Sequence, residues 1–220
     1  MRRTFAKIAA AALALTVSCT VATPASADQA GAAAAPTAAQ LKAAVAKCTS
    51  QLSSGKYAHD AGGPAKVPVC KTKGAVHWRA DLDIDCDGKY RKECKDDPYR
   101  QGETAFGGAL DPVALPFVVV PGISSRWSYA KSGIGGGTVA AVIYKDKVAY
   151  AVVGDVGPTA IIGEGSYALA KALGINPHPN KGGTDGPVDY VLFPGVTAKK
   201  INDQASARSL GAAAAAKLVG

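Results

Sequence analysis

Two carboxylates with glycine neighbours stand close together in the second half of the chain. Asp155 lies in Gly154-Asp155-Val156-Gly157-Pro158, and Glu164 lies in Gly163-Glu164-Gly165-Ser166. Hydrolysis of a sugar bond requires one carboxyl group that gives a proton and one that activates water. Asp after Gly is also common in turns, and Glu before a helix is common in caps, so the pair alone does not establish an active site.

The flanking residues predict the elements that hold this pair. Residues 138–144 and 148–153 are β-prone runs separated by a polar turn, which predicts a hairpin that ends where Pro158 stops the strand. After Glu164, residues 167–173 have a helical apolar spacing, with Ser166 as N-cap and Gly174 as terminator. We therefore expect Asp155 at a strand end and Glu164 just ahead of a helix.

Carboxylates alternate with apolar residues at positions 81–87, which predicts a strand with one acidic face. Like charges on one face repel each other unless a polyamine, a metal or nearby Lys and Arg side chains neutralise them. The plainer alternative is a solvated edge strand. The segment also imitates the start of a calcium loop, but Cys94 stands where that loop needs a Glu. The acidic side chains of this strand are Asp81, Asp83, Asp85 and Asp87.

The order of segments 81–88, 153–173 and 188–195 resembles glycoside hydrolase family 75, the secreted endo-chitosanases first known from fungi, and indicates a bacterial member. The resemblance covers roughly residues 57–195. It implies endo-hydrolysis of the β-1,4 bonds of chitosan with inversion, carried by Asp155 and Glu164. Glu164 is taken as the acid and Asp155 as the base, with the exchanged roles left open. The fold it implies is mainly β with peripheral helices (α+β), a small six-stranded double-psi-like β-barrel.

Further site residues follow from the same resemblance and from residue type. The resemblance favours amino-sugar binding by Asp83 and Asp85. Aromatic rings stack on sugars but pack in cores more often, and Trp127 and Tyr167 are the expected stacking residues. We expect no cofactor and no metal. A non-catalytic expansin-like wall-binding barrel and an endoglucanase-like hydrolase of a neutral glucan are the alternatives.

The chain ends predict export. Residues 1–27 have the basic, apolar and small-residue regions of a signal peptide, so the protein is expected to be secreted and free of the membrane after cleavage. Residues 28–36 form an Ala-rich lead-in expected to be disordered, and residues 37–220 form a single catalytic domain. A capping box at 37–40 predicts a helix, and the Ala-rich tail 202–218 predicts another, interrupted at Gly211.

The cysteine count and the net charge limit the disulfide pattern and the kinds of partner that the protein can have. Removal of the leader leaves Cys48, Cys70, Cys86 and Cys94, which predicts two disulfides with three possible connectivities. Pairing of sequence neighbours, Cys48 with Cys70 and Cys86 with Cys94, is favoured. The net charge is +8, but the basic residues are scattered and no nucleic-acid motif accompanies them. The expected partner is therefore a polysaccharide, not a nucleic acid, and a monomer is expected.

Overall fold

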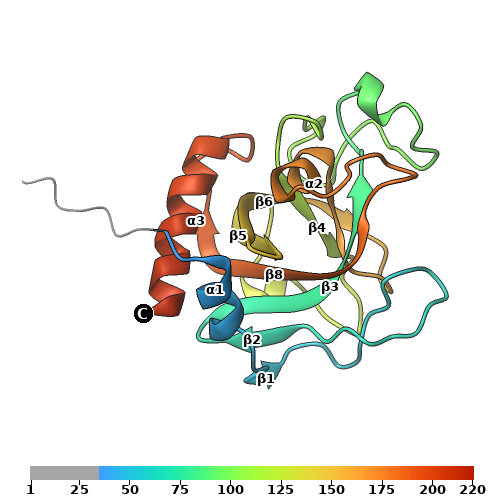
Figure 1. Cartoon of the computed structure of the whole chain (residues 1–220). Helices are drawn as coiled ribbons and strands as arrows, with labels where there is room; N and C mark the ends of the chain where they lie inside the picture. The colour runs from blue at the N-terminus through green and yellow to red at the C-terminus, as the bar shows by residue number, and fades with distance from the viewer. Residues whose placement is uncertain (1–34) are drawn as a thin grey trace, which may run out of the picture. The chain divides into compact units, whose positions relative to one another are not determined.

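The computed structural model describes residues 35–220, and these are built around a closed β-barrel (Figure 1). Going round the ring, the strands are β3, β7, β4, β6, β5 and β8, and β8 pairs back to β3. This confirms the expected mainly β fold and its six-stranded barrel. The bounds are β3 (Ala75–Asp85), β4 (Phe117–Pro121), β5 (Thr138–Tyr144), β6 (Lys147–Gly157), β7 (Glu164–Ser166) and β8 (Thr184–Thr197).

Two short strands and two single turns of 3-10 helix accompany the ring. The strands β1 (Ser50–Gln51) and β2 (Cys70–Thr72) extend the sheet from the start of β3. The 3-10 turns lie at Lys92–Cys94 and Ala130–Ser132. Most neighbours in the ring are antiparallel, but β4 with β6 and β3 with β7 are parallel pairs.

Strand β5 shows why the barrel strands are apolar on both faces. Ala140 and Val142 point into the barrel core with Trp78 and Tyr190, while Val139 and Ile143 belong to a second apolar cluster outside the ring. That second cluster includes side chains of the first and last helices of the described residues, which cover this side of the barrel. A continuous run of apolar residues is the expected signature of a strand buried on both faces.

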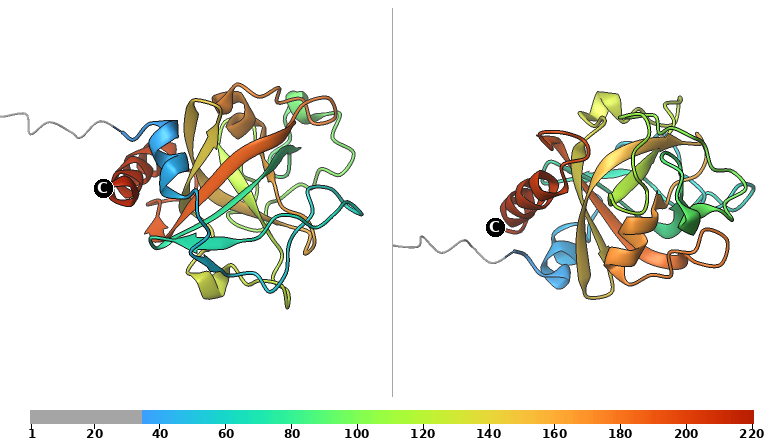
Figure 2. Two further views of the ribbon diagram at one scale, coloured as in Figure 1. Left: turned by 60° about the horizontal axis from the view of Figure 1, so that its bottom comes forward. Right: turned by 90° about the horizontal axis from the view of Figure 1, so that it is seen from above.

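Three helices of the described residues lie against the barrel (Figures 1 and 2). Helices α1 (Ala38–Ala44) and α3 (Gln204–Val219) lie side by side on one flank, and α2 (Tyr167–Leu173) lies on another part of the barrel. The expected caps are present. Thr37 and Gln40 form a capping box on α1, and Ser166 accepts a hydrogen bond from the backbone N–H of Leu169 at the start of α2. Donors at the starts of α1 and α2 thus find hydrogen-bond acceptors on residues close to them in the chain.

The expected break in the last helix is wrong, because α3 runs through Gly211 without interruption. A Cβ at position 211 would lie 2.4 Å from Cδ1 of Tyr150, which no side chain could tolerate. The glycine therefore serves close packing of the helix on β6, and tertiary contact outweighs its poor helix propensity.

Both disulfides have the favoured pairing, Cys48 with Cys70 and Cys86 with Cys94. The first ties the segment after α1 to β2, and the second closes the loop that follows β3. The expected signal peptide, 1–27, and the lead-in up to residue 34 lie outside the described residues. Among the helices of residues 35–220, none is both long and apolar enough to cross a membrane.

Candidate active site

Asp155 lies near the end of strand β6, as expected, and Glu164 lies in the short strand β7 just ahead of α2. Strand β6 continues through Gly154 as far as Gly157, and Asp155 pairs with Val119 of β4. Glu164 opens the short strand β7 and pairs with Asp83 of β3. Because β4 lies between β6 and β7 in the ring, the two carboxylates come from closely neighbouring parts of the sheet.

A cleft of about 800 Å³ lies over this part of the barrel. Among residues 35–220, five acidic side chains and no basic side chain line its walls. Glu164 lines this cleft, whereas Asp155 is not among its lining residues and is 5% exposed. The acidic side chains that line the cleft are Asp83, Asp85, Asp87, Asp97 and Glu164.

Glu164 has the properties of a proton donor. Burial, and then the negative charges of Asp83, Asp155 and Asp87, raise its pKa from 4.5 to about 7. A carboxyl group with such a pKa still holds its proton in mildly acidic and near-neutral solution, as general acids do. The lack of a side chain at Gly157 makes room for it, since a Cβ there would lie 2.5 Å from Oε2 of Glu164.

Asp155 is held in a different way. Its Oδ1 accepts hydrogen bonds from the backbone N–H groups of Ala105 and Val156, each at 2.7 Å. Burial raises the pKa of Asp155, while these two hydrogen bonds act against that rise. The carboxylate is thus fixed in orientation, and its ionised form is supported by the backbone.

Asp155 forms one of two clusters of carboxylates, here called the strand-end triad, with Asp85 and Asp87. One oxygen from each residue lies within 4.8 Å of the others. Oδ1 of Asp85 accepts from the N–H of Asp87, and Oδ1 of Asp87 accepts from the N–H of Gln101. Every member therefore has at least one backbone donor.

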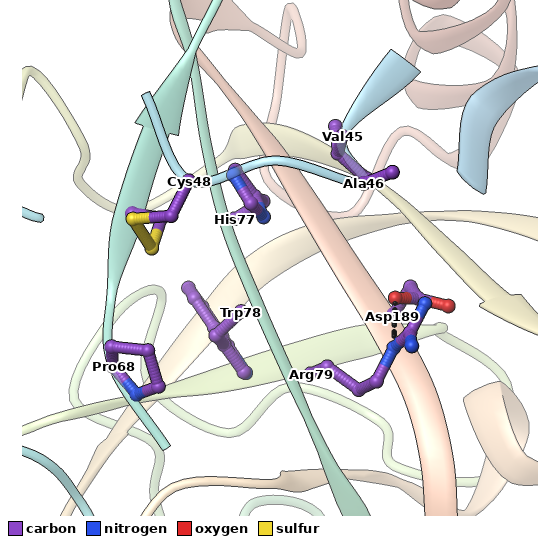
Figure 3. Close-up of a pocket in the computed structure, with 9 residues that line it drawn as sticks. Val45, Ala46, Cys48, Pro68, His77, Trp78, Arg79 and Asp189 are labelled. Atoms are coloured by element: carbon purple, nitrogen blue, oxygen red, sulfur yellow. Dashed lines mark hydrogen bonds and ion pairs between the residues drawn. A yellow bond between two sulfur atoms is a disulfide. The ribbon is translucent and has the colours of Figure 1, made fainter. Parts of the chain in front are cut away.

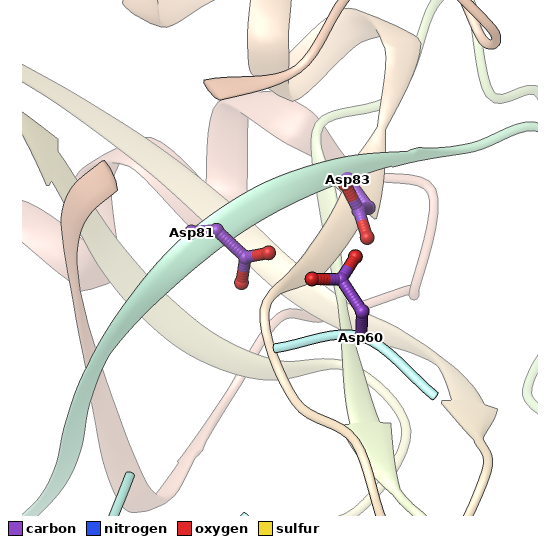
Figure 4. Close-up of side chains that lie close together, drawn as sticks. All are labelled: Asp60, Asp81 and Asp83. Atoms are coloured by element: carbon purple, nitrogen blue, oxygen red, sulfur yellow. The ribbon is translucent and has the colours of Figure 1, made fainter. Parts of the chain in front are cut away.

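A second cluster, here called the loop triad, consists of Asp60, Asp81 and Asp83 (Figure 4). One oxygen from each again lies within 4.8 Å of the others. Asp81 is 6% exposed, and its Oδ1 has no hydrogen-bond partner. Burial, and then the charge of Asp83, raise the pKa of Asp81 to about 7. Asp60 was not singled out by sequence, because it is distant in the chain and has no pattern around it.

The expected stacking residues lie elsewhere. Trp127 is 5% exposed and packs edge-on against Trp78 in the barrel core, with its Nε1 donating to Oγ of Ser132. Neither Trp127 nor the half-buried Tyr167 lines the cleft within residues 35–220. Tyr99, which sequence reasoning missed, lines it and is 88% exposed. A loop aromatic between charged and proline residues offered no periodic signal that could have identified it.

A smaller pocket of about 200 Å³ lies beside the Cys48–Cys70 disulfide (Figure 3). Its acid, Asp189, is paired with Arg79 through Nε at 2.7 Å. His77 lies 2.9 Å from Oγ1 of Thr72, and burial lowers the pKa of His77. Arg79 and Asp189 are thus engaged with each other and His77 with Thr72, and we place the candidate active site in the larger cleft.

Comparison with known proteins identifies the family of this chain. Residues 82–216 match the family model described as fungal chitosanase of glycosyl hydrolase group 75. Endo-chitosanase C of Aspergillus oryzae is 35% identical over 125 residues, which cover 55% of this chain and 32% of that protein. An endo-chitosanase of Aspergillus fumigatus is 31% identical over 157 residues, covering 66% of this chain and 64% of that protein. The chain therefore spans only about a third of the first of these relatives.

Proposed function

This chain belongs to the glycosyl hydrolase group 75 family, and on that premise we propose that it is an endo-chitosanase. The observation that carries the proposal is the charge of the cleft. Within the part of the chain that the structure describes, five carboxyl groups and no basic side chain line it, although the whole sequence has a net charge of +8. A polymer of protonated amino sugars complements such a surface, whereas a neutral glucan gains nothing from it. Of the two expected binding residues, Asp85 is assigned to the ammonium group of a bound sugar.

In the proposed mechanism, Glu164 protonates the oxygen of the glycosidic bond as that bond breaks. Its pKa of about 7 supports this role, because the proton is present in the pH range where chitosan is soluble and charged. The proton leaves with the departing sugar, and Glu164 becomes negatively charged. The positive charge that develops at the sugar carbon is then stabilised by the carboxylates that surround it.

Asp155 is proposed as the base that takes a proton from the attacking water. The backbone donors on its Oδ1 support an ionised, oriented carboxylate, and water attack opposite the leaving group inverts the anomeric carbon. Asp85 and Asp87 share its cluster and line the cleft, so either could be the base if water does not reach Asp155.

Secretion and a monomeric state are part of the same proposal. Two disulfides suit an oxidising compartment such as the exterior of the cell. The expected leader is consistent with that location, and a polymer too large to cross a membrane would be met there.

The test is incubation of purified protein with soluble chitosan, chitin and soluble cellulose, followed by measurement of reducing ends and product size. We expect short oligomers from chitosan and far less product from the two uncharged polymers. NMR of the earliest products should detect the α anomer. Binding to chitosan without new reducing ends would overturn the enzymatic assignment, and initial β anomer would overturn the assignment of inversion.

A further inference from the structure

The loop triad contains a buried acid that the proposed hydrolysis does not use. Asp81 is 6% exposed, and no N–H of another described residue donates to its carboxyl group. Within residues 35–220, no Lys or Arg forms an ion pair with Asp60, Asp81 or Asp83. A buried carboxyl group without donors or a cation is costly, so it calls for a partner.

The three carboxyl groups face a common space. Figure 4 shows Asp81 and Asp83, on β3, turned toward Asp60 on the neighbouring loop, whose carboxyl group is turned toward both. Their nearest oxygens lie within 4.8 Å of one another. Calcium–oxygen bonds measure about 2.3–2.6 Å, so two ligand oxygens on opposite sides of a Ca²⁺ ion are about 5 Å apart. The observed spacing therefore accommodates one ion between the three residues.

The backbone holds the three ligands in place before any ion binds. The segment that carries Asp60 is fixed by the bridges of Tyr57 with Val67 and of Ala58 with Ile161. The N–H of Asp83 donates to the carbonyl of Gly163 at 2.8 Å. A Cβ at Gly163 would lie 2.0 Å from Oδ1 of Asp81, so this glycine leaves room for the carboxyl group.

The strand-end triad provides the contrast that singles out the loop triad. Each of its members accepts at least one backbone N–H, so its charge is already partly compensated. Asp81 lacks such a donor from any other residue. From this difference we propose that Asp60, Asp81 and Asp83 form a calcium site, with water completing the coordination on the exposed side of Asp60 and Asp83.

Calcium fits better than magnesium for a geometric reason. Mg²⁺ requires near-ideal octahedral geometry at shorter distances and gives up its water reluctantly, whereas Ca²⁺ accepts six to eight oxygens in an irregular arrangement. Three ligands from a strand and a surface loop give such an irregular set. The bound ion would join the Asp60 loop to β3 at one end of the cleft.

The experiment uses the purified protein treated with EDTA, dialysed, and titrated with CaCl2 by calorimetry at neutral pH. We expect one Ca²⁺ per chain. The melting temperature should rise by about 5–10 °C when Ca²⁺ exceeds its dissociation constant a hundredfold. MgCl2 should give a smaller rise. These readouts do not depend on activity, so they separate this proposal from the chitosanase assignment.

Three variants locate the ion. Asp81→Asn and, as a second variant on the exposed loop, Asp60→Asn should abolish the calcium heat and the rise in melting temperature. Asp87→Asn, in the strand-end triad, should keep both, as should the control Asp146→Asn in the β5–β6 turn. Loss in Asp87→Asn with retention in Asp81→Asn would overturn the site.

Two further outcomes would also overturn it. Absence of calcium binding to the unmodified protein would mean that the three acids share a proton instead of a metal. A rise in melting temperature with glucosamine hydrochloride but not with CaCl2 would assign the cluster to the ammonium group of the substrate.

Discussion

The two carboxylate triads both consist of aspartates and both include residues of β3, yet the chain holds them differently. In the strand-end triad, backbone N–H groups of residues 87, 101, 105 and 156 donate to the carboxylates. In the loop triad, Oδ1 of Asp81 is buried without a partner. Donors favour the ionised form and burial without donors favours the neutral or metal-bound form. At Asp85 burial outweighs the single donor and raises the pKa well above its usual range, so the charge of each aspartate is set by the balance of burial and donors around it.

The largest expected effect tests the proposed catalytic pair, Glu164 and Asp155. Glu164→Gln and Asp155→Asn should each lower the rate of chitosan hydrolysis by at least about 100-fold, the usual scale for loss of a general acid or base. Both changes are nearly isosteric, so the melting temperature should change little in comparison. Initial rates of reducing-end formation provide the measurement.

Two comparisons sharpen that result. If Asp155→Asn keeps near-normal turnover while Asp85→Asn or Asp87→Asn loses it, the general base is the residue whose substitution stops turnover. Both Asp85 and Asp87 line the cleft. If Glu164→Gln remains active, Glu164 is not the acid, whatever the pKa that its neighbours confer on it.

The next effect concerns the room left for Asp81. Gly163→Ala introduces a side chain at a φ of 124° and against Oδ1 of Asp81, so the free energy of unfolding should fall by at least about 1–3 kcal/mol. Urea denaturation gives the value. Gly102→Ala is the matched control, since a Cβ there meets nothing within 4 Å and should leave stability nearly unchanged.

A third prediction follows from the protons held by Asp81 and Glu164. Their pKa values rise from 3.8 and 4.5 to about 7, so between these limits the folded state binds more protons than the unfolded state. Stability should therefore fall as pH rises from about 4 to about 7 and level off above. Melting temperatures in EDTA from pH 4 to pH 8 should follow this course.

The same scan compares the triads directly. Asp81→Asn should reduce the fall in melting temperature, because it removes one of the carboxyl groups whose pKa is strongly raised, and Asp146→Asn should not. An equal fall in Asp81→Asn and the unmodified protein would mean that Asp81 titrates as in the unfolded chain, and the contrast between the triads would be lost.

The smallest expected effect concerns the cleft wall near the strand-end triad. Tyr99→Ala should raise KM for chitosan by about threefold to tenfold with little change in kcat, the scale of one aromatic stacking contact. Tyr90→Ala is the control, because Tyr90 is also exposed but does not line the cleft. An equal rise in both variants would assign the effect to the loop as a whole.

Much of the local structure could be read from the sequence because it depends on residues near one another in the chain. The alternation of 81–87, the hairpin of β5 and β6, and the caps at Thr37 and Ser166 follow from spacings of two to four residues. The order of the acidic motifs was also sufficient to identify the family. These features need no knowledge of which strands pair.

The tertiary structure decided everything that depends on distant neighbours. It buried Trp127 against Trp78 and withdrew Asp155 from the cleft wall, since burial depends on how the strands close. It allowed Gly211 within a continuous helix, because close contact with Tyr150 outweighs local propensity. It also brought Asp60 to Asp81 and paired Glu164 with Asp83. Periodicity tells which face a carboxylate occupies, but only packing supplies the donors and charges that fix its pKa.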